Sequence, residues 1–281
     1  MTLLQAIVLG IVQGLTEFLP ISSTAHLRIV PAIFGWHFYG GTTNDPGAAF
    51  TAVIQLGTTI AIVVYFWREL LHVTVAWFRG IVDRSVRGTL EYRLGWYLIV
   101  ATIPVAVFGL VFSHQIETGA RNLWLISSTL IGLAIVLGAA EKVGKRERGE
   151  EELDTKDAIA VGSAQALALI PGTSRSGVTI TAGLFRGLDR ETAARFSFLL
   201  SIPAVVLSGL YEARHIGEGS SPGGGLTGVA VLFAFIVGLM SIAWLMRWIT
   251  RHSTFIFIYY RVAMGVLLLL LLSTGVLDPT K

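Results

Sequence analysis

Long apolar stretches alternate along this chain with short polar or charged segments. Six of these stretches approach the roughly 20 residues that a helix needs to cross a membrane: residues 47–67, 94–113, 122–140, 196–211, 226–246 and 254–274. An open sheet would leave backbone groups unpaired in lipid, and the alternation expected of a β-barrel is absent. The pattern therefore predicts an all-α polytopic membrane protein.

Two further apolar regions are too short to span, and a polar break interrupts each of them. Residues 2–36 break around Glu17–Ser23, and residues 158–185 break at 171–179. Non-helical backbone is tolerated at membrane depth only where it is buried in protein or lines a cavity. We therefore predict two re-entrant helical hairpins, at 1–40 and 157–187, besides about six transmembrane helices. Two half-helices in each hairpin would bring the total to about ten helices.

The two halves of the chain can be aligned with each other. Four residues of the first half recur in the same order in the second: Gly10, Gln13, Pro20 and Ser23 match Gly162, Gln165, Pro171 and Ser174. We predict a single integral membrane domain over residues 1–281. Repeat one covers about 1–140, repeat two covers about 157–281, and a charged cytoplasmic loop at 141–156 separates them.

The distribution of basic residues predicts the topology, since basic loops face the cytoplasm. Lys and Arg are concentrated in segments 68–93, 141–157, 186–195 and 247–251. We expect segment 68–93 to lie as an amphipathic helix on the membrane surface. Six spans satisfy this distribution if the first hairpin enters from outside and the second from the cytoplasm. Opposite entry defines an inverted-topology repeat, whose site lies near the midplane, and it places both termini outside.

Composition narrows the class of protein. Charged residues make up 14% of the 281 residues, against about 25% in soluble domains, and the mean hydropathy is +0.70. The net charge of +3 comes from basic loops without a basic face carrying aromatics, so we expect no nucleic-acid partner. The absence of cysteine excludes disulfides and thiolate chemistry. The N-terminus lacks a basic region, so we expect no cleavable signal.

The first polar break holds side chains that are costly in lipid and therefore favour a functional cavity. Gln13 and Glu17 lie four residues apart and share one helix face. Glu17 is a candidate general base, metal ligand or orienter of His26. A serine, Ser22 or Ser23, is a candidate nucleophile, and His26 is also a candidate nucleophile or acid for the leaving group. The sequence leaves these roles open.

Both breaks also resemble helix starts that bind anions. Proline precedes serine and threonine at 20–24 and at 171–174, and serine and threonine are preferred helix caps. A helix N-terminus offers free N–H groups to an anion. Arg175 adds a forked cation that matches phosphate geometry, and the hydroxyls of Ser174, Ser176 and Thr179 add further donors. Two such ends at one cavity suit a ligand with more than one negative group.

Structural roles compete with these functional ones. Glu17 and Arg175 would also satisfy each other as a purely structural ion pair. Gln55 and Gln165 fit hydrogen bonds between helices. Arg261, inside the last apolar stretch, is expected to extend its side chain to the membrane interface.

Two motifs carry a resemblance to a known family. Gln13-Gly-Leu-Thr-Glu17-Phe-Leu-Pro-Ile-Ser-Ser-Thr-Ala-His26 resembles the first, serine-rich signature of the undecaprenyl-diphosphate phosphatases, or bacitracin-resistance proteins. Pro171-Gly-Thr-Ser-Arg-Ser-Gly-Val-Thr179 resembles their second. Gln13 stands where the pattern permits Glu or Gln, which argues against a mechanism that needs two carboxylates there. Ala25 replaces a glycine found in many members.

The resemblance implies hydrolysis of undecaprenyl diphosphate to undecaprenyl phosphate and inorganic phosphate. This reaction recycles the lipid carrier of peptidoglycan synthesis, and overproduction of the enzyme confers bacitracin resistance. The resemblance also implies a divalent cation, Mg²⁺ in most members, and catalytic roles for Glu17, Ser23, His26 and Arg175, with Glu17 as a candidate metal ligand. We expect seven residues to bind substrate: Gln13, Ser22, Thr24, Thr173, Ser174, Ser176 and Thr179. The expected location is the bacterial plasma (inner) membrane, and the expected substrate is a polyprenyl diphosphate lipid. A homodimer is the expected alternative to a monomer.

Three other functions compete with this interpretation. Inverted repeats with broken helices are typical of transporters and lipid flippases. A phosphatidate-type phosphatase is rejected, because Thr181 occupies the place of its histidine. A non-catalytic lipid-binding scaffold leaves Glu17, His26 and Arg175 unexplained.

Overall fold

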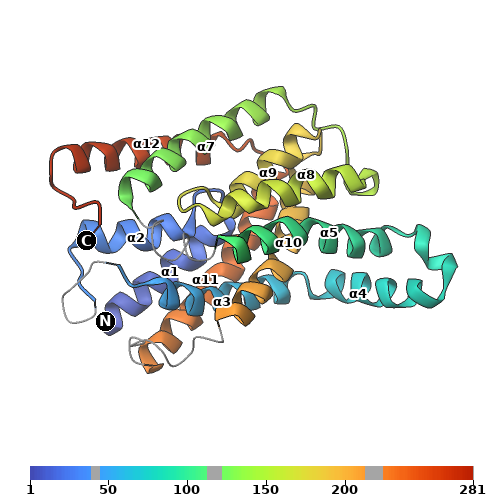
Figure 1. Cartoon of the computed structure of the whole chain (residues 1–281), viewed down its shortest axis with the longest axis horizontal. Helices are drawn as coiled ribbons and strands as arrows, with labels where there is room; N and C mark the ends of the chain where they lie inside the picture. Colours follow the sequence, from blue (N-terminus) through green and yellow to red (C-terminus); the bar gives the residue numbers. More distant parts are fainter. Residues whose placement is uncertain (39–44, 113–121, 213–223, 281) are drawn as a thin grey trace.

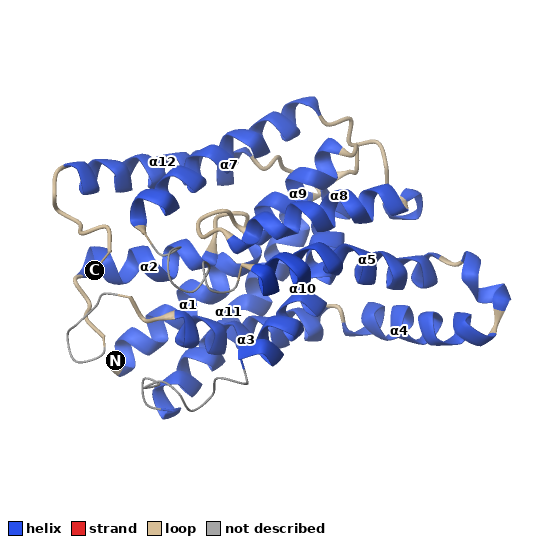
Figure 2. Ribbon diagram, in the orientation of Figure 1, coloured by secondary structure: helices blue, strands red, loops and turns tan. Residues whose placement is uncertain are grey.

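The protein is helical throughout the part that the computed structural model describes, which is residues 1–38, 45–112, 122–212 and 224–280 (Figures 1 and 2). Its α-helices are α1 (Leu3–Phe18), α2 (Ser23–Phe34), α3 (Ala48–Tyr65), α4 (Trp67–Val82), α5 (Leu90–Val111), α7 (Leu123–Val143), α8 (Thr155–Ala166), α9 (Arg175–Phe185), α10 (Arg190–Glu212), α11 (Gly224–Ile249) and α12 (Phe255–Ser273). Short 3₁₀ turns cover Arg84–Gly88, Glu150–Glu152 and Leu167–Leu169. The prediction of an all-α polytopic membrane protein is confirmed.

Helices α5, α7, α11 and α12 are each long and apolar enough to cross a membrane. They coincide with four of the six predicted spans. The predicted span 47–67 is α3, which meets α4 at a 75° bend, so the pair counts as one broken span or as a re-entrant turn. Helix α10 contains the remaining predicted stretch, 196–211. The segment predicted to lie on the surface, 68–93, therefore contributes the extra helix α4.

The two predicted hairpins are present as pairs of half-length helices. Helices α1 and α2 meet at residues 19–22, and α8 and α9 meet at 170–174 after a 3₁₀ turn. In Figure 1 the two hairpins point toward the middle of the molecule from opposite ends, and both termini lie at the left end. This arrangement is the one expected for an inverted-topology repeat.

A serine in the same unusual conformation caps the second helix of each hairpin. Ser22 has φ 76° and ψ 100°, and Ser174 has φ 69° and ψ 111°. The Ser22 hydroxyl accepts from Ala25 N at 3.4 Å, and the Ser174 hydroxyl accepts from Gly177 N at 3.1 Å. The matched geometry makes Ser22 the counterpart of Ser174. The sequence alignment pairs Ser23 with Ser174, so it is wrong by one residue at this point.

The first helix of each hairpin packs against a spanning helix of the other half. Helix α1 packs most extensively against α11, and α8 packs against α5. A Cβ at Gly10 would lie 2.4 Å from the Ala230 carbonyl oxygen, and one at Gly162 would lie 2.4 Å from the Ala101 carbonyl oxygen. These matching glycines therefore permit equivalent close contacts. The predicted repeat boundaries, 1–140 and 157–281, stay predictions.

Ion pairs attach the segment between α7 and α8 to the neighbouring helices. Asp157 is fully buried and pairs at 2.7 Å with both Arg148 and Arg186. Glu150 pairs with Arg195 at 3.3 Å, and burial raises the pKa of the Glu150 carboxyl despite that cation. Buried carboxylates need such partners. The network fixes the base of the second hairpin and so the position of its polar break.

Candidate active site

The carboxylate of Glu17 is the centre of the polar cluster between the two hairpins. It lies in the last turn of α1 and is 8% exposed. Gln13 Nε2 and Ser23 Oγ donate to its Oε2 atom at 2.9 and 2.6 Å. Gln55 Nε2 on α3 donates to Oε1 at 3.0 Å, and Arg175 forms an ion pair with the same oxygen. Two predicted catalytic residues, Ser23 and Arg175, thus both contact a third, Glu17.

Ser23 and Arg175 reach Glu17 from equivalent places. Each is the first residue of its helix and directly follows a serine cap with positive φ. Side chains from the first residue of both helices therefore contact the same carboxylate. These contacts confirm the prediction that the two polar breaks meet at one place in the structure.

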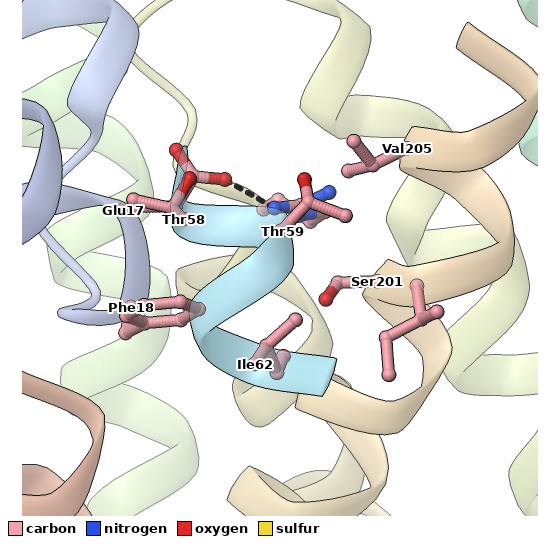
Figure 3. A pocket seen from close by; sticks show the side chains of 9 residues that line it. Glu17, Phe18, Thr58, Thr59, Ile62, Ser201 and Val205 are labelled. Carbon is pink, nitrogen blue, oxygen red and sulfur yellow. Dashed lines mark hydrogen bonds and ion pairs between the residues drawn. The ribbon is translucent and has the colours of Figure 1, made fainter. Parts of the chain in front are cut away.

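A small, partly open pocket lies beside this cluster, between α1, α3, α9 and α10. Its lining residues are Glu17, Phe18, Thr58, Thr59, Ile62, Arg175, Ser201, Ile202 and Val205. Figure 3 shows Glu17, Thr58 and Thr59 on one side of the pocket and Phe18 and Ile62 on another. A charged polar end thus adjoins an apolar wall, which suits an amphiphilic ligand with an anionic head.

His26 lies in a separate hydrogen-bonded group. Its Nδ1 atom is 2.7 Å from the carbonyl oxygen of Ser22, and its Nε2 atom is 2.6 Å from the hydroxyl of Tyr260 on α12. The two rings also stack, with centroids 5.5 Å apart. Neither nitrogen bonds to Glu17 or Ser23, so Glu17 does not orient the His26 ring in this structure.

The predicted substrate-binding residues divide in the same way. Gln13 joins the Glu17 cluster. The other six lie at the two helix starts and are absent from the pocket lining: Ser22, Thr24, Thr173, Ser174, Ser176 and Thr179. The hydroxyls of Ser22 and Thr24 are 3.2 Å apart, and those of Ser174 and Ser176 are 3.3 Å apart. Their hydroxyls organise the breaks around the site.

Thr179 and Ser176 bind the second hairpin to its surroundings. The Thr179 hydroxyl is 2.6 Å from that of Ser197 on α10, and the Ser176 hydroxyl donates to the Leu19 carbonyl oxygen at 3.1 Å. The contact to Leu19 joins the two breaks directly. These two residues therefore support the site from behind.

Arg261 was expected at the membrane interface, and that prediction is wrong. The residue is fully buried in α12. Its guanidinium donates to the carbonyl oxygens of Pro20 at 3.3 Å, Gly172 at 3.3 Å and Thr173 at 3.0 Å, and also to Leu130 at 3.2 Å. Broken helices leave carbonyls without N–H partners, and one arginine supplies donors to both breaks. A single cation inside an apolar stretch was the sequence signal for this role.

The site offers oxygen donors of the kind that Mg²⁺ prefers. No group of three His, Cys, Asp or Glu residues able to hold a metal occurs among the described residues. Mg²⁺ does not require one, because it commonly uses one or two carboxylates together with substrate phosphates. Glu17 supplies the carboxylate, and the adjacent Gln13 Oε1 atom is buried with no hydrogen-bond partner in the described part of the chain. The donor set fits an ion shared with a phosphorylated substrate.

Comparisons with known proteins agree with one another. The family model for Bacitracin resistance protein BacA matches residues 6–267. The chain is 52% identical to an undecaprenyl-diphosphatase of Chlorobaculum tepidum, covering 99% of this chain and 100% of the relative. It is also 52% identical to one of Myxococcus xanthus (99% and 92%) and 51% identical to one of Mycolicibacterium smegmatis (99% and 99%). Full-length identity around one half, together with the family match, shows that the chain belongs to the BacA family of bacitracin resistance proteins.

Proposed function

We propose that this protein is an undecaprenyl-diphosphatase, which hydrolyses undecaprenyl diphosphate to undecaprenyl phosphate and inorganic phosphate. The observation that carries the proposal is the Glu17 carboxylate, which contacts Ser23 and Arg175 from two helix N-termini. The names of the full-length relatives support the same reaction. The product is the lipid carrier of peptidoglycan synthesis, and its recycling underlies bacitracin resistance.

We infer that Ser23 takes the first chemical step. Its hydroxyl already points at Glu17 Oε2 at 2.6 Å, so the carboxylate can take the proton as the oxygen attacks. The Ser23 oxygen forms a bond to the terminal phosphorus, and the bond from that phosphorus to the bridging oxygen breaks. Undecaprenyl phosphate leaves with the bridging oxygen. The proton on Glu17 passes to the departing phosphate, so the carboxylate is a base again. It then takes a proton from a water that attacks the phosphoserine phosphorus; the bond from phosphorus to the Ser23 oxygen breaks, that oxygen takes the proton back, and inorganic phosphate is released. Direct attack on the terminal phosphorus by a water that His26 or Glu17 activates is the competing mechanism.

Arg175 and the two helix starts bind the diphosphate. One guanidinium nitrogen of Arg175 contacts Glu17, and the side chain, 18% exposed, also lines the pocket. Its remaining N–H groups are available to phosphate oxygens. Removing a comparable oxyanion donor costs about 10²–10³ in rate. The apolar wall formed by Phe18 and Ile62 would lie beside the first carbons of the prenyl tail.

A divalent cation, Mg²⁺ by preference, would bind to Glu17 and Gln13 Oε1 together with the substrate phosphates. When bound, it neutralises charge on the transferring phosphoryl group. The residues themselves hold the proton of Ser23 and the orientation of the diphosphate. Glu17 as a metal ligand and Glu17 as a base are compatible, because the carboxylate has two oxygens.

The chain is a multi-pass membrane protein, and we place it in the bacterial plasma membrane with both termini external. The basic segments around 68–93 and 141–157 support this orientation through the positive-inside rule. The polyprenyl tail would stay in the bilayer while the diphosphate reaches the pocket. A homodimer stays a prediction, and nucleic acid is not an expected partner.

Phosphate release by purified protein in detergent tests the proposal. Wild type should release phosphate from undecaprenyl diphosphate, and Glu17→Ala and Ser23→Ala should not. A transporter or flippase would release none, because detergent leaves no second compartment to transport into. Near-normal turnover by folded Ser23→Ala would exclude the phosphoserine mechanism and favour direct attack by water. Glu151→Gln is a matched control, since that carboxylate is 82% exposed and remote from the pocket.

A further inference from the structure

We propose that His26 is a positioning residue for Ser22 and Ser23, and that Tyr260 is a second positioning residue that fixes the His26 ring. The proposal rests on the hydrolysis proposed above and concerns how its nucleophile is held. Its observations are the hydrogen bonds of both ring nitrogens and the strained backbone that one of them reaches.

Both ring nitrogens of His26 are already occupied. A carbonyl oxygen only accepts, so the 2.7 Å contact with the Ser22 carbonyl requires the proton on Nδ1. In the neutral ring, Nε2 then accepts from the Tyr260 hydroxyl at 2.6 Å, and in the charged ring it donates to it. In either state no nitrogen is free to take a proton from Ser23. The ring is 5% exposed and stacks on Tyr260, which holds it in this orientation.

The carbonyl that His26 holds belongs to a strained residue. Ser22 has φ 76°, a region that residues other than glycine rarely adopt. Such conformations cost energy and persist where surrounding contacts fix them. His26 supplies two of these contacts, since its backbone N donates to the Ser22 carbonyl at 3.3 Å and its Nδ1 donates at 2.7 Å. The next residue is Ser23, whose direction toward Glu17 depends on the backbone of Ser22.

In the second hairpin, the carbonyl of the serine cap has no histidine to bind it. Ser174 has the same conformation, and the backbone N of Val178 donates to its carbonyl oxygen at 3.0 Å. Val178 has no side-chain donor. There the carbonyls of Gly172 and Thr173, just before the cap, accept from Arg261, which in the first hairpin donates to the Pro20 carbonyl. Arg261 thus contacts both breaks, whereas its neighbour Tyr260 contacts the first cap alone, through His26.

Three substitutions of His26 separate positioning from acid–base chemistry. His26→Asn places an amide N–H near the former Nδ1 and keeps the bond to Ser22. His26→Gln extends its amide toward the former Nε2 position, and His26→Ala has no donor. We expect Asn to stay within about tenfold of wild-type kcat, near the value of one hydrogen bond. Gln and Ala should lose about a hundredfold, as expected for a misplaced nucleophile. If folded His26→Asn is as inactive as His26→Ala, the proposal is overturned.

Tyr260→Phe tests the second half of the proposal and keeps the ring that packs on His26. We expect a kcat about tenfold lower with KM unchanged, because one hydrogen bond is lost away from the substrate. In the His26→Asn background the same substitution should cost nothing more, since Asn has no group at Nε2. Wild-type kcat in Tyr260→Phe, or losses that add in the double variant, would refute the role of Tyr260 in fixing the His26 ring. Thermal unfolding in detergent establishes that each variant is folded, and wild-type turnover tests the hydrolysis itself independently.

Discussion

Replacing Glu17 by glutamine separates its structural role from its chemical role. The carboxylate accepts from Gln13 and Ser23 at one oxygen, and from Gln55 and Arg175 at the other. A glutamine has only one acceptor oxygen. If that oxygen faces Gln55 and Arg175, the new amide N–H group faces Gln13 and Ser23.

Both of those neighbours can adapt to a donor. The Gln13 Oε1 atom is buried without a hydrogen-bond partner in the described structure, so turning its amide over presents this oxygen to the new N–H. The Ser23 hydroxyl can rotate and accept. We therefore expect a loss of unfolding free energy of about 1–3 kcal/mol, the cost of one imperfect buried group. The Ser23 proton, however, no longer points at a base. Turnover should fall about 10²–10⁴-fold, the usual contribution of a general base.

The assay combines phosphate release with thermal unfolding of the same detergent sample. Glu17→Ala provides the contrast, because it leaves Arg175 without its partner and should destabilise by about 3–5 kcal/mol. Glu151→Gln controls for the loss of an exposed carboxylate and should behave as wild type. A folded Glu17→Gln protein with turnover within about tenfold of wild type would refute the assignment of Glu17 as base.

Three further outcomes follow from the same contacts. Arg175→Ala should lower kcat/KM by about a hundredfold or more, and a smaller loss would show that other donors hold the diphosphate. Arg261→Lys should lower the unfolding free energy by about 1–3 kcal/mol, because a single ammonium cannot reach the carbonyls of Pro20, Gly172 and Thr173 together; an unchanged melting temperature would contradict this. Chelation of divalent cations should abolish phosphate release and added Mg²⁺ should restore it, whereas activity that survives chelation would exclude a cation requirement.

Much of the fold was predictable because membranes impose simple rules. Uninterrupted apolar stretches gave α5, α7, α11 and α12 directly. The two hairpins followed from polar breaks in stretches too short to span, and their caps followed from proline with serine. The cost of burying an isolated charge predicted an ion pair between Glu17 and Arg175 as the structural alternative to a role in the site, and the structure contains that pair.

The remaining features depend on partners that are distant in sequence. Gln55 and Tyr260 carry no local pattern that points to Glu17 or His26, and their roles arise only when α3 and α12 pack beside the hairpins. The interface rule failed for Arg261 because unpaired carbonyls at the breaks compete with water for its donors. The sequence around Phe66 contains no proline or glycine that would predict the bend there. The alignment of the two repeats was wrong by one residue at Ser23 because a few scattered identities fit equally well after such a shift. The backbone angles of Ser22 and Ser174 identify the correct pairing.

The crosswise packing of α1 on α11 and of α8 on α5 constrains how the chain is made. Gly10 meets Ala230, about 220 residues later, and a ribosome adds roughly 5–20 residues per second. For roughly 10–40 s of synthesis, the first hairpin therefore exists without its packing partner. Glu17 also lacks Arg175 for most of that time. Until its second half is made, the nascent chain carries Glu17 without its arginine partner. Assembly, as well as catalysis, therefore depends on contacts between the two halves.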